Sequence, residues 1–256
     1  LKFSEQWLRE WVNPTVNTNA LADQLTMAGL EVDSVEPAAP VFSGVIIGKV
    51  LSAEKHPDAK RLNCCKVDVG GKNILDIVCG GVNVREGILV PVAIVGAMLP
   101  NNFKIKKAKL RGMPSEGMIC SSEELGLGES LPHCIMALRD DAPVGKDFRE
   151  YLDLDDHIID IELTPNRGDC LCIRGIARDV AVVNDMAVVA HDVAPQAATI
   201  QDKFPVSVLA LEACPRYVGR VIRHINVDAV TPLWLEERLR RSGMRTTHPV
   251  VDILNY

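Results

Sequence analysis

The sequence predicts an α+β protein of more than one domain, in which an α/β unit is interrupted by an all-β unit. Three observations support this prediction. Residues 1–36 have the periodicity of two helices followed by a strand. Residues 44–99 consist of short runs rich in Val and Ile that are separated by glycines, as in a small closed β-barrel. Helix and strand patterns then return from residue 157 onward, and 256 residues suffice for more than one core.

The amino-terminal unit has clear start and stop signals. Ser4 is a suitable N-cap for a first helix, and Asn13-Pro14 ends that helix. A second helix follows, which Gly29 can end in the left-handed conformation. Residues 30–36 then alternate between apolar and polar side chains, which predicts a strand.

An α/β pattern follows the β-rich region. Residues 157–163 alternate as a strand, and the turn at residues 164–169 ends on Asp169, which is suited to cap a helix. We therefore expect Arg167 and Asp169 to fix a strand-to-helix turn. Residues 170–185 supply the helix. Its apolar face is predicted to consist of Leu171, Ile176, Val180 and Val183.

The order of these patterns indicates one domain interrupted by another. We predict a discontinuous α/β domain of residues 1–40 and 150–195, with a domain of residues 41–149 inserted into it. Such insertions succeed at exposed turns where the two ends of the host chain lie close together. Because the sequence begins at Leu1 instead of Met, we expect it to be a piece of a longer protein.

A third unit, residues 200–256, follows a linker with Pro and Ala at 191–200. Its first helix is predicted to have Thr231 as the N-cap and Pro232 as the first helical residue. Residues 246–256 are predicted to form a strand. The third unit is therefore predicted to be the truncated start of another α/β domain.

Composition argues against several classes of protein. The longest apolar run, residues 88–99, contains Pro91 and Gly96 and is shorter than the roughly 18 residues that span a bilayer. The first residues lack the apolar core of a secretion signal. The eight cysteines and six histidines do not stand at zinc-ligand spacing, which favours reduced thiols. Only 4% of the residues are aromatic, which argues against a base-stacking surface.

Positive charge is concentrated in one place. The formal net charge is −6, but residues 41–149 carry 15 Lys and Arg against 12 Asp and Glu. Five of these cations lie within residues 104–111, namely Lys104, Lys106, Lys107, Lys109 and Arg111. A basic run on a small β-barrel favours a polyanionic partner. The alternative is that these side chains solvate one strand and protect a sheet edge from pairing.

Three motifs of the β-rich region carry a family resemblance. HPDAKRL (56–62), IVCGGVNVREG (77–87) and KIKKAKLRGMPSEGMICS (104–121) resemble the tRNA-binding OB-fold of several aminoacyl-tRNA synthetases and of free-standing tRNA-binding proteins. The most specific part is residues 109–118. The resemblance implies that Lys109 and Arg111 reach phosphates and that Ser115 belongs to the tRNA-binding surface, together with the other cations of residues 104–111.

The flanking segments narrow the family. KFSEQWLREWV (2–12), MAGLEVDSVE (27–36), LTPNRGDCLCIRGIARDVAV (163–182) and CPRYVGRVI (214–222) resemble bacterial phenylalanyl-tRNA synthetase β subunits. In that family, the OB-fold is inserted into an α/β domain, as the pattern above predicts here. The family enzyme is a cytoplasmic α2β2 heterotetramer that uses ATP and Mg²⁺ to join phenylalanine to its tRNA.

The resemblance also implies where the chemistry lies. The family's catalytic core belongs to the α subunit, so no catalytic residue, metal ligand or cofactor is expected in this chain, and no DNA or membrane partner. The third unit resembles the start of an editing domain of the B3/B4 type, which hydrolyses mischarged Tyr-tRNA. Arg245 and Asn255 match residues of its pocket, whereas Leu254 stands where the family commonly has Thr.

Two other readings of the same residues stay open. The OB-fold can serve a tRNA-binding protein that is not a synthetase, or it can be a purely structural module at a subunit interface. His56, which precedes Pro57 in the loop after the first barrel strand, is expected to order that loop and not to act as a base.

Overall fold

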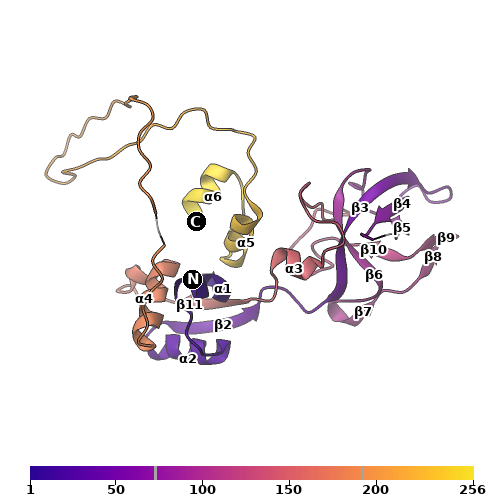
Figure 1. The fold of residues 1–256 in the computed structure, drawn as a ribbon, viewed down its shortest axis with the longest axis horizontal. Coiled ribbons are helices and arrows are strands. Elements are labelled where there is room, and N and C mark those ends of the chain that lie inside the picture. Colours follow the sequence, from indigo (N-terminus) through magenta and orange to yellow (C-terminus); the bar gives the residue numbers. More distant parts are fainter. Residues whose placement is uncertain (72–73, 192) are drawn as a thin grey trace.

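The structure is a computed structural model, and it describes residues 1–71, 74–191 and 193–256. Lys72 and Asn73, at the start of one predicted β run, and Asp192, in the predicted linker, lie outside the described residues. Figure 1 shows two bodies joined by a narrow connection, and a long irregular segment that leads to two carboxyl-terminal helices.

The first body is a three-stranded antiparallel sheet with helices packed against it. The strands lie in the order β1 (Lys2–Ser4), β11 (His157–Glu162) and β2 (Glu31–Pro37). The helices are α1 (Glu5–Trp11), α2 (Thr18–Met27) and α4 (Ile173–Val183). The central strand thus comes from a distant part of the chain. The core contains Leu8, Leu25, Ile159 and Ile176.

Local signals begin and end the first two helices as predicted. The Ser4 hydroxyl accepts a hydrogen bond from the Trp7 N–H at 3.1 Å and caps α1. Gly29 ends α2 with φ of +86°, a conformation that glycine adopts without steric cost. The strand predicted at residues 30–36 is present as β2. The short strand β1 was not predicted, because three residues do not reveal an alternation.

The start of α4 differs from the prediction. Asp169 lies in a 3₁₀ turn, Gly168–Cys170, and the N-cap is Cys172, which makes no side-chain capping bond. The turn folds back onto the helix at Gly175, where a Cβ atom would lie 1.8 Å from the Asp169 carbonyl oxygen. This contact fixes which side of α4 faces the core. Leu171, which precedes the helix, and Val183, its last residue, are both exposed. The buried residues are Ile173, Gly175, Ile176, Ala177, Val180 and Ala181.

The second body is a six-stranded antiparallel sheet. Its strands are β3 (Ser43–Lys55), β4 (Asn63–Asp68), β5 (Ile74–Cys79), β6 (Leu89–Leu99), β7 (Phe103–Lys104) and β10 (Gly117–Ile119). They pair in the order β10-β6-β3-β4-β5, and β7 also pairs with β6. The two ends of this order meet where the Glu116 N–H donates to the Asp76 carbonyl at 2.7 Å.

Smaller elements complete the second body. A separate hairpin is formed by β8 (Ala108–Leu110) and β9 (Met113–Ser115), and it extends from the outer end of this body in Figure 1. Helix α3 (Phe148–Leu152) packs Phe148 into a core that contains Ile47 and Leu99. A 3₁₀ turn, Pro100–Asn102, connects β6 to β7.

Two predictions for the third unit are wrong. Helix α5 (Leu233–Arg241) begins one residue later than predicted, and Pro232 occupies the N-cap position. The Thr231 hydroxyl instead donates a hydrogen bond to the Asp252 carboxylate. Residues 246–256 do not form a strand, because Pro249–Asn255 is the helix α6.

Capping and burial account for α6. Its N-cap, His248, accepts a hydrogen bond from the Val250 N–H through its ring, and Pro249 is favoured in a first turn. The buried Asp252 side chain also accepts from the Thr247 N–H at 3.0 Å. Among the described residues, no strand lies beside this segment to share its backbone hydrogen bonds, whereas a helix satisfies them internally.

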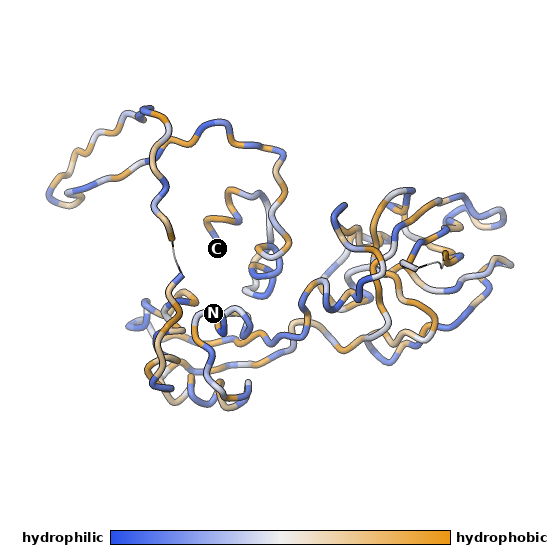
Figure 2. The backbone as a smooth tube through the Cα atoms, viewed as in Figure 1, coloured by the Kyte–Doolittle hydropathy of each residue, from blue (hydrophilic) through white to orange (hydrophobic). Residues whose placement is uncertain are grey.

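Residues 184–232 contain no helix or strand within the described part of the chain. This segment carries many exposed apolar side chains, among them Phe204, Leu209 and Val227, and Figure 2 shows hydrophobic residues along its length. No helix of the described residues is both long enough and apolar enough to cross a membrane.

Candidate nucleic-acid interface

The basic segment, residues 104–111, does not form one continuous strand. Lys104 ends β7, Lys109 lies in β8, and residues 105–107 belong to no strand. Ile105 is buried and still exchanges backbone hydrogen bonds of 2.9 Å with Gly96 and Ala97 of β6, and the chain leaves the sheet after it. All five predicted cations are exposed. We call Lys104, Lys106, Lys107, Lys109 and Arg111 the basic face.

Arg111 occupies an unusual position at the tip of the β8–β9 hairpin. Leu110 pairs with Met113, so the turn contains only Arg111 and Gly112, and both have positive φ, at 51° and 88°. This is the geometry of a type I′ turn, which favours Asn, Asp or Gly at its first position. Arginine is uncommon in this conformation, and such backbone outliers cluster at functional sites.

His56 contacts the hairpin next to its tip and orders its own loop, the role predicted for it. Its Nδ1 accepts from the Asp58 N–H at 3.0 Å, so Nε2 carries the proton and donates to the Leu110 carbonyl at 3.1 Å. The ring is buried. Lys60 and Arg61 lie on the loop that follows His56, and both are exposed. They add two cations that do not belong to the basic run of residues 104–111.

Ser115 does not present its hydroxyl to solvent. The side chain is buried, accepts from the Val78 N–H at 3.1 Å and donates to the Gly117 carbonyl at 3.1 Å. Its hydrogen-bonding capacity is therefore used inside the protein. It joins the second hairpin strand to β5.

One cation of the basic face is paired. The Lys107 ammonium lies 2.8 Å from the Glu116 carboxylate, and 71% of its side chain stays exposed. No other residue of the basic face forms an ion pair with a described residue. Four of the five cations therefore face solvent without an ion pair to a described residue, which favours the approach of an anion.

A groove of about 550 Å³ runs beside these cations. One part of its wall is formed by Phe103, Lys104, Lys106 and Leu110, and another by Glu123 and Glu124. Phe103 is 57% exposed. Sequence reasoning did not identify Phe103, because a low aromatic content says nothing of where the few aromatic rings lie.

The two predicted pocket residues of the third unit lie on different elements. Arg245 follows α5, Asn255 is in the last turn of α6, and both are exposed. Among the described residues, no hydrogen bond joins them to each other or to a third side chain. The structure thus shows two accessible polar side chains without a common partner.

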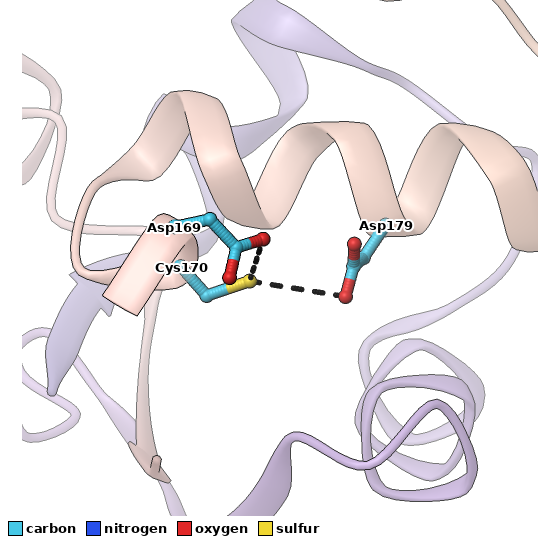
Figure 3. A group of neighbouring side chains, drawn as sticks. All are labelled: Asp169, Cys170 and Asp179. Atoms are coloured by element: carbon cyan, nitrogen blue, oxygen red, sulfur yellow. Dashed lines mark hydrogen bonds between the residues drawn. The ribbon is translucent and has the colours of Figure 1, made fainter. Parts of the chain in front are cut away.

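A different cluster brings together groups that could in principle hold a metal ion. Asp169, Cys170 and Asp179 meet where the 3₁₀ turn packs on α4 (Figure 3), with their ligand atoms within 4.8 Å of one another. However, the Arg167 guanidinium pairs with Asp179 and contacts the Cys170 sulfur at 3.0 Å. Burial and the nearby Asp179 raise the pKa of Cys170 to about 11. The thiol is thus protonated at neutral pH, and the cation in this cluster is Arg167.

Comparison with known proteins places these features in context. A family model of a tRNA binding domain matches residues 45–147, and a model of the B3/4 domain matches residues 213–256. Phenylalanine–tRNA ligase beta subunits from Dickeya dadantii and Coxiella burnetii are each 58% identical to this chain over its whole length. The chain spans 32% of the length of these relatives.

Two solved structures match a smaller part. The C-terminal domain of p43 from Plasmodium vivax is 28% identical, with a TM-score of 0.30, and covers 40% of this chain and 57% of its own. A MetRS-related protein from Pyrococcus horikoshii is 24% identical, with a TM-score of 0.31, and covers 40% of this chain and 86% of its own.

Proposed function

We infer that this chain, which belongs to the family of phenylalanine–tRNA ligase beta subunits, binds tRNA through the basic face of its second body. The observation that carries the proposal is the exposure of all five cations on the part of the chain that matches a tRNA binding domain. Arg111 adds support. The backbone at the hairpin tip favours Asn or Gly, yet the sequence has an arginine there, which places a cationic side chain at the outermost point of the hairpin.

The chemistry of the basic face suits phosphate more than base recognition. Lysine and arginine side chains contact phosphate oxygens from a range of directions, and such contacts position a nucleic acid without reading its sequence. Lys60 and Arg61 extend the same surface along the loop that His56 holds against the hairpin. The expected ligand is therefore the tRNA backbone, and binding should depend strongly on salt.

We further propose that the second body is an OB-type barrel inserted into the first. The hydrogen bond from Glu116 to Asp76 supports closure, because it joins the two ends of the strand order. The pairing of β11 between β1 and β2 supports insertion. The proposed domains are residues 1–40 with 150–195, residues 41–149, and residues 200–256 as the start of a B3/B4-type editing domain.

The rest of the enzyme follows from the family. We propose that the whole protein works in the cytoplasm as the β subunit of an α2β2 ligase, whose α subunit attaches phenylalanine to tRNA with ATP and Mg²⁺. The present chain should then charge no tRNA by itself. Aminoacylation assays with phenylalanine, ATP and tRNA should show only background, and clear turnover by this chain would contradict the assignment of catalysis to the α subunit.

A salt series tests the tRNA-binding proposal. Each phosphate contact adds about −0.7 to the slope of log K against log salt for a single strand, so three contacts give roughly −2. Simultaneous replacement of Lys107, Lys109 and Arg111 by Ala should flatten this slope in fluorescence anisotropy with labelled tRNA. A triple variant of the exposed Lys2, Lys203 and Arg216 removes the same charge outside the second body and should retain the native slope.

Equal affinities and slopes for the native chain and the basic-face variant would contradict the proposal. The five cations would then serve only to solvate the hairpin, and the second body would have a structural role. Circular dichroism of both triple variants checks that the fold is kept, since exposed substitutions usually change stability by less than about 0.5 kcal/mol.

We also propose that Arg245 and Asn255 contribute to an editing pocket in the full-length protein. Their exposure supports this, because neither side chain is used inside the described structure. Arg245→Ala in the full-length enzyme should slow hydrolysis of Tyr-tRNA and leave phenylalanine charging nearly unchanged. A parallel loss of both activities would indicate a structural role for Arg245.

A further inference from the structure

Phe103 is an exposed aromatic ring beside the basic face. It begins β7, directly before Lys104, and 57% of its surface is accessible. Single exposed apolar side chains are common on protein surfaces, so the meaning of this exposure comes from the place of Phe103 beside the basic face and on the lining of two hollows. None of the functions proposed above uses this ring.

Phe103 lines two neighbouring hollows of the surface. On one side lies the groove of about 550 Å³, which Lys104 and Lys106 also line. On the other side lies a hollow of about 690 Å³ that includes Asn101 and Asn102. A flat group can therefore approach the ring from either hollow.

The backbone holds the ring in place. Phe103 pairs with the buried Leu99 of β6, and Asn101 and Asn102 reach it through a tight turn with φ of 61° and 58°. A ring anchored on a strand loses little conformational freedom when a ligand stacks on it, and this favours binding.

Charge indicates which part of a nucleotide enters the groove. Lys104, the chain neighbour of Phe103, and Lys106 line the groove, and Glu123 and Glu124 line it as well. A phosphate is attracted to the lysines and repelled by the glutamates. A base with an exocyclic amino group can donate to a carboxylate, as the amino groups of adenine and cytosine do. One oxygen of Glu124 already accepts from the Ser121 N–H at 2.7 Å, which leaves the other for such a donor.

We propose that Phe103 stacks on an unpaired base of bound RNA, with its phosphates on the neighbouring lysines and its amino edge toward Glu123 and Glu124. This inference rests on the proposed tRNA-binding function and adds base stacking to it. Stacking on an aromatic ring tolerates any base, because every base has a π-face. The glutamates then favour adenine or cytosine over uracil, which has no amino group.

Labelled single-stranded RNA tests the proposal. The 256-residue chain and its variants are titrated into oligoadenylate, oligocytidylate and oligouridylate of about 12 nucleotides, within the site size of related folds. Phe103→Ala should weaken oligoadenylate binding by about fivefold to a hundredfold, the range found for single stacking residues. The salt slope should stay native, because the phosphate contacts are intact. The native preference for adenine and cytosine over uracil should shrink when Glu123 and Glu124 are replaced together by Gln.

Two further substitutions separate stacking from apolar contact. Phe103→Leu keeps an apolar side chain without a π-face and should weaken binding about as much as Phe103→Ala. Phe103→Trp should keep the affinity and show quenching of its fluorescence by oligoadenylate, because the native tryptophans Trp7, Trp11 and Trp234 all lie outside residues 41–149. Phe204→Ala, which removes an even more exposed ring (79%) from the irregular segment, should bind as the native chain does.

The outcomes distinguish the two proposals. Native affinity of Phe103→Ala, together with a flattened slope of the basic-face variant, would overturn stacking and leave tRNA binding by phosphate contacts in place. Absence of salt-dependent binding by the native chain, to tRNA and to all three oligonucleotides, would overturn both. Equal weakening by Phe103→Ala and Phe204→Ala would also contradict a specific role for Phe103.

Discussion

Two regions of this chain use positive charge in opposite ways. On the basic face, Lys107 pairs with Glu116 while 71% and 35% of the two side chains remain exposed. In α5, Arg241 pairs with Asp156 at 2.8 Å, and the corresponding exposures are 6% and 0%. The first pair can exchange its partner for a ligand, because water already surrounds it. The second pair has no such freedom.

The surroundings of Arg241 show what a buried charge requires. Its guanidinium also donates to the carbonyls of Leu152 and Asp153 at 2.7 and 2.9 Å, and lies 3.2 Å from Glu237. Asp156 in turn accepts from the Ser4 hydroxyl. These bonds join α5 to the first body and to the segment after α3. Desolvating two charges is costly, and the hydrogen bonds of the two terminal guanidinium nitrogens offset part of that cost. The buried Nε of Arg241 has no hydrogen-bond partner among the described residues.

The contrast teaches that position, more than residue type, decides the role of a cation. An exposed pair contributes at most about 1 kcal/mol to stability and is weakened by salt. Loss of one partner from a buried pair leaves an uncompensated charge and costs about 3–5 kcal/mol. Arg241 is therefore expected to stabilise the docking of α5, whereas the basic face is expected to affect binding and not folding.

The largest predicted effect follows from removing Arg241. Arg241→Ala should destabilise the contact between α5 and the first body by about 3–5 kcal/mol, because the Asp156 carboxylate stays buried without its cationic partner. Urea unfolding followed by tryptophan fluorescence measures this, since Trp7 and Trp11 lie in α1 and Trp234 lies in α5.

Arg240→Ala is the matched control on the same helix. Arg240 pairs with Glu237 at 2.9 Å, but 29% of its side chain is exposed, so a loss below about 1 kcal/mol is expected. Equal losses of stability for Arg241→Ala and Arg240→Ala would contradict the proposal that burial decides how much a charged residue stabilises the fold.

The second prediction concerns pH and the contact between α5 and α6. The hydrogen bond from Thr231 holds the pKa of the Asp252 carboxyl below its usual value. A lowered folded-state pKa contributes stability above the unfolded-state pKa of about 3.9, and this stability is lost as pH falls through the lower folded value. Amide exchange in α6 should therefore accelerate on acidification below about pH 4.

Two substitutions sharpen this prediction. Asp252→Asn removes the titrating group, so the acid-dependent acceleration should disappear. Thr231→Val removes the donor and should shift the acceleration to higher pH, whereas Thr231→Ser keeps the hydroxyl and should resemble the native chain. An unchanged acid profile in Asp252→Asn would show that another group controls the contact.

Much of the fold could be predicted where the signal is local. Ser4 caps α1 and Gly29 ends α2 because each acts through bonds to its nearest neighbours in the chain. Asp169 illustrates the limit. The sequence supports a cap at this position, but the fit of the turn against Gly175 moves the helix start to Ile173. That contact depends on the folded geometry, which no local pattern contains.

The candidate site shows the same limit. The charge pattern identified all five residues of the basic face, since exposure is the default for Lys and Arg. The family resemblance also implied a role in tRNA contact for Ser115, whose hydroxyl the structure places in two internal hydrogen bonds. Phe103 was missed because an aromatic residue is expected to be buried, whereas in the structure its side chain is exposed and lines two hollows.

The smallest predicted effect concerns the exposed pair itself. Glu116→Gln should change the free energy of unfolding by less than about 1 kcal/mol, and a double-mutant cycle with Lys107→Ala should give a coupling of about 0.2–1 kcal/mol that falls as salt rises. The same substitution releases Lys107 from its carboxylate partner and should slightly strengthen tRNA binding at low salt. Thermal unfolding and fluorescence anisotropy measure the two effects.

Asp76→Asn, which breaks the exposed pair with Lys66, is the control for a change of one negative charge on the same body. A Lys107–Glu116 coupling as large as that expected for Arg241 and Asp156 would mean that the hairpin depends on this pair, and exposure alone would no longer explain how the two regions differ.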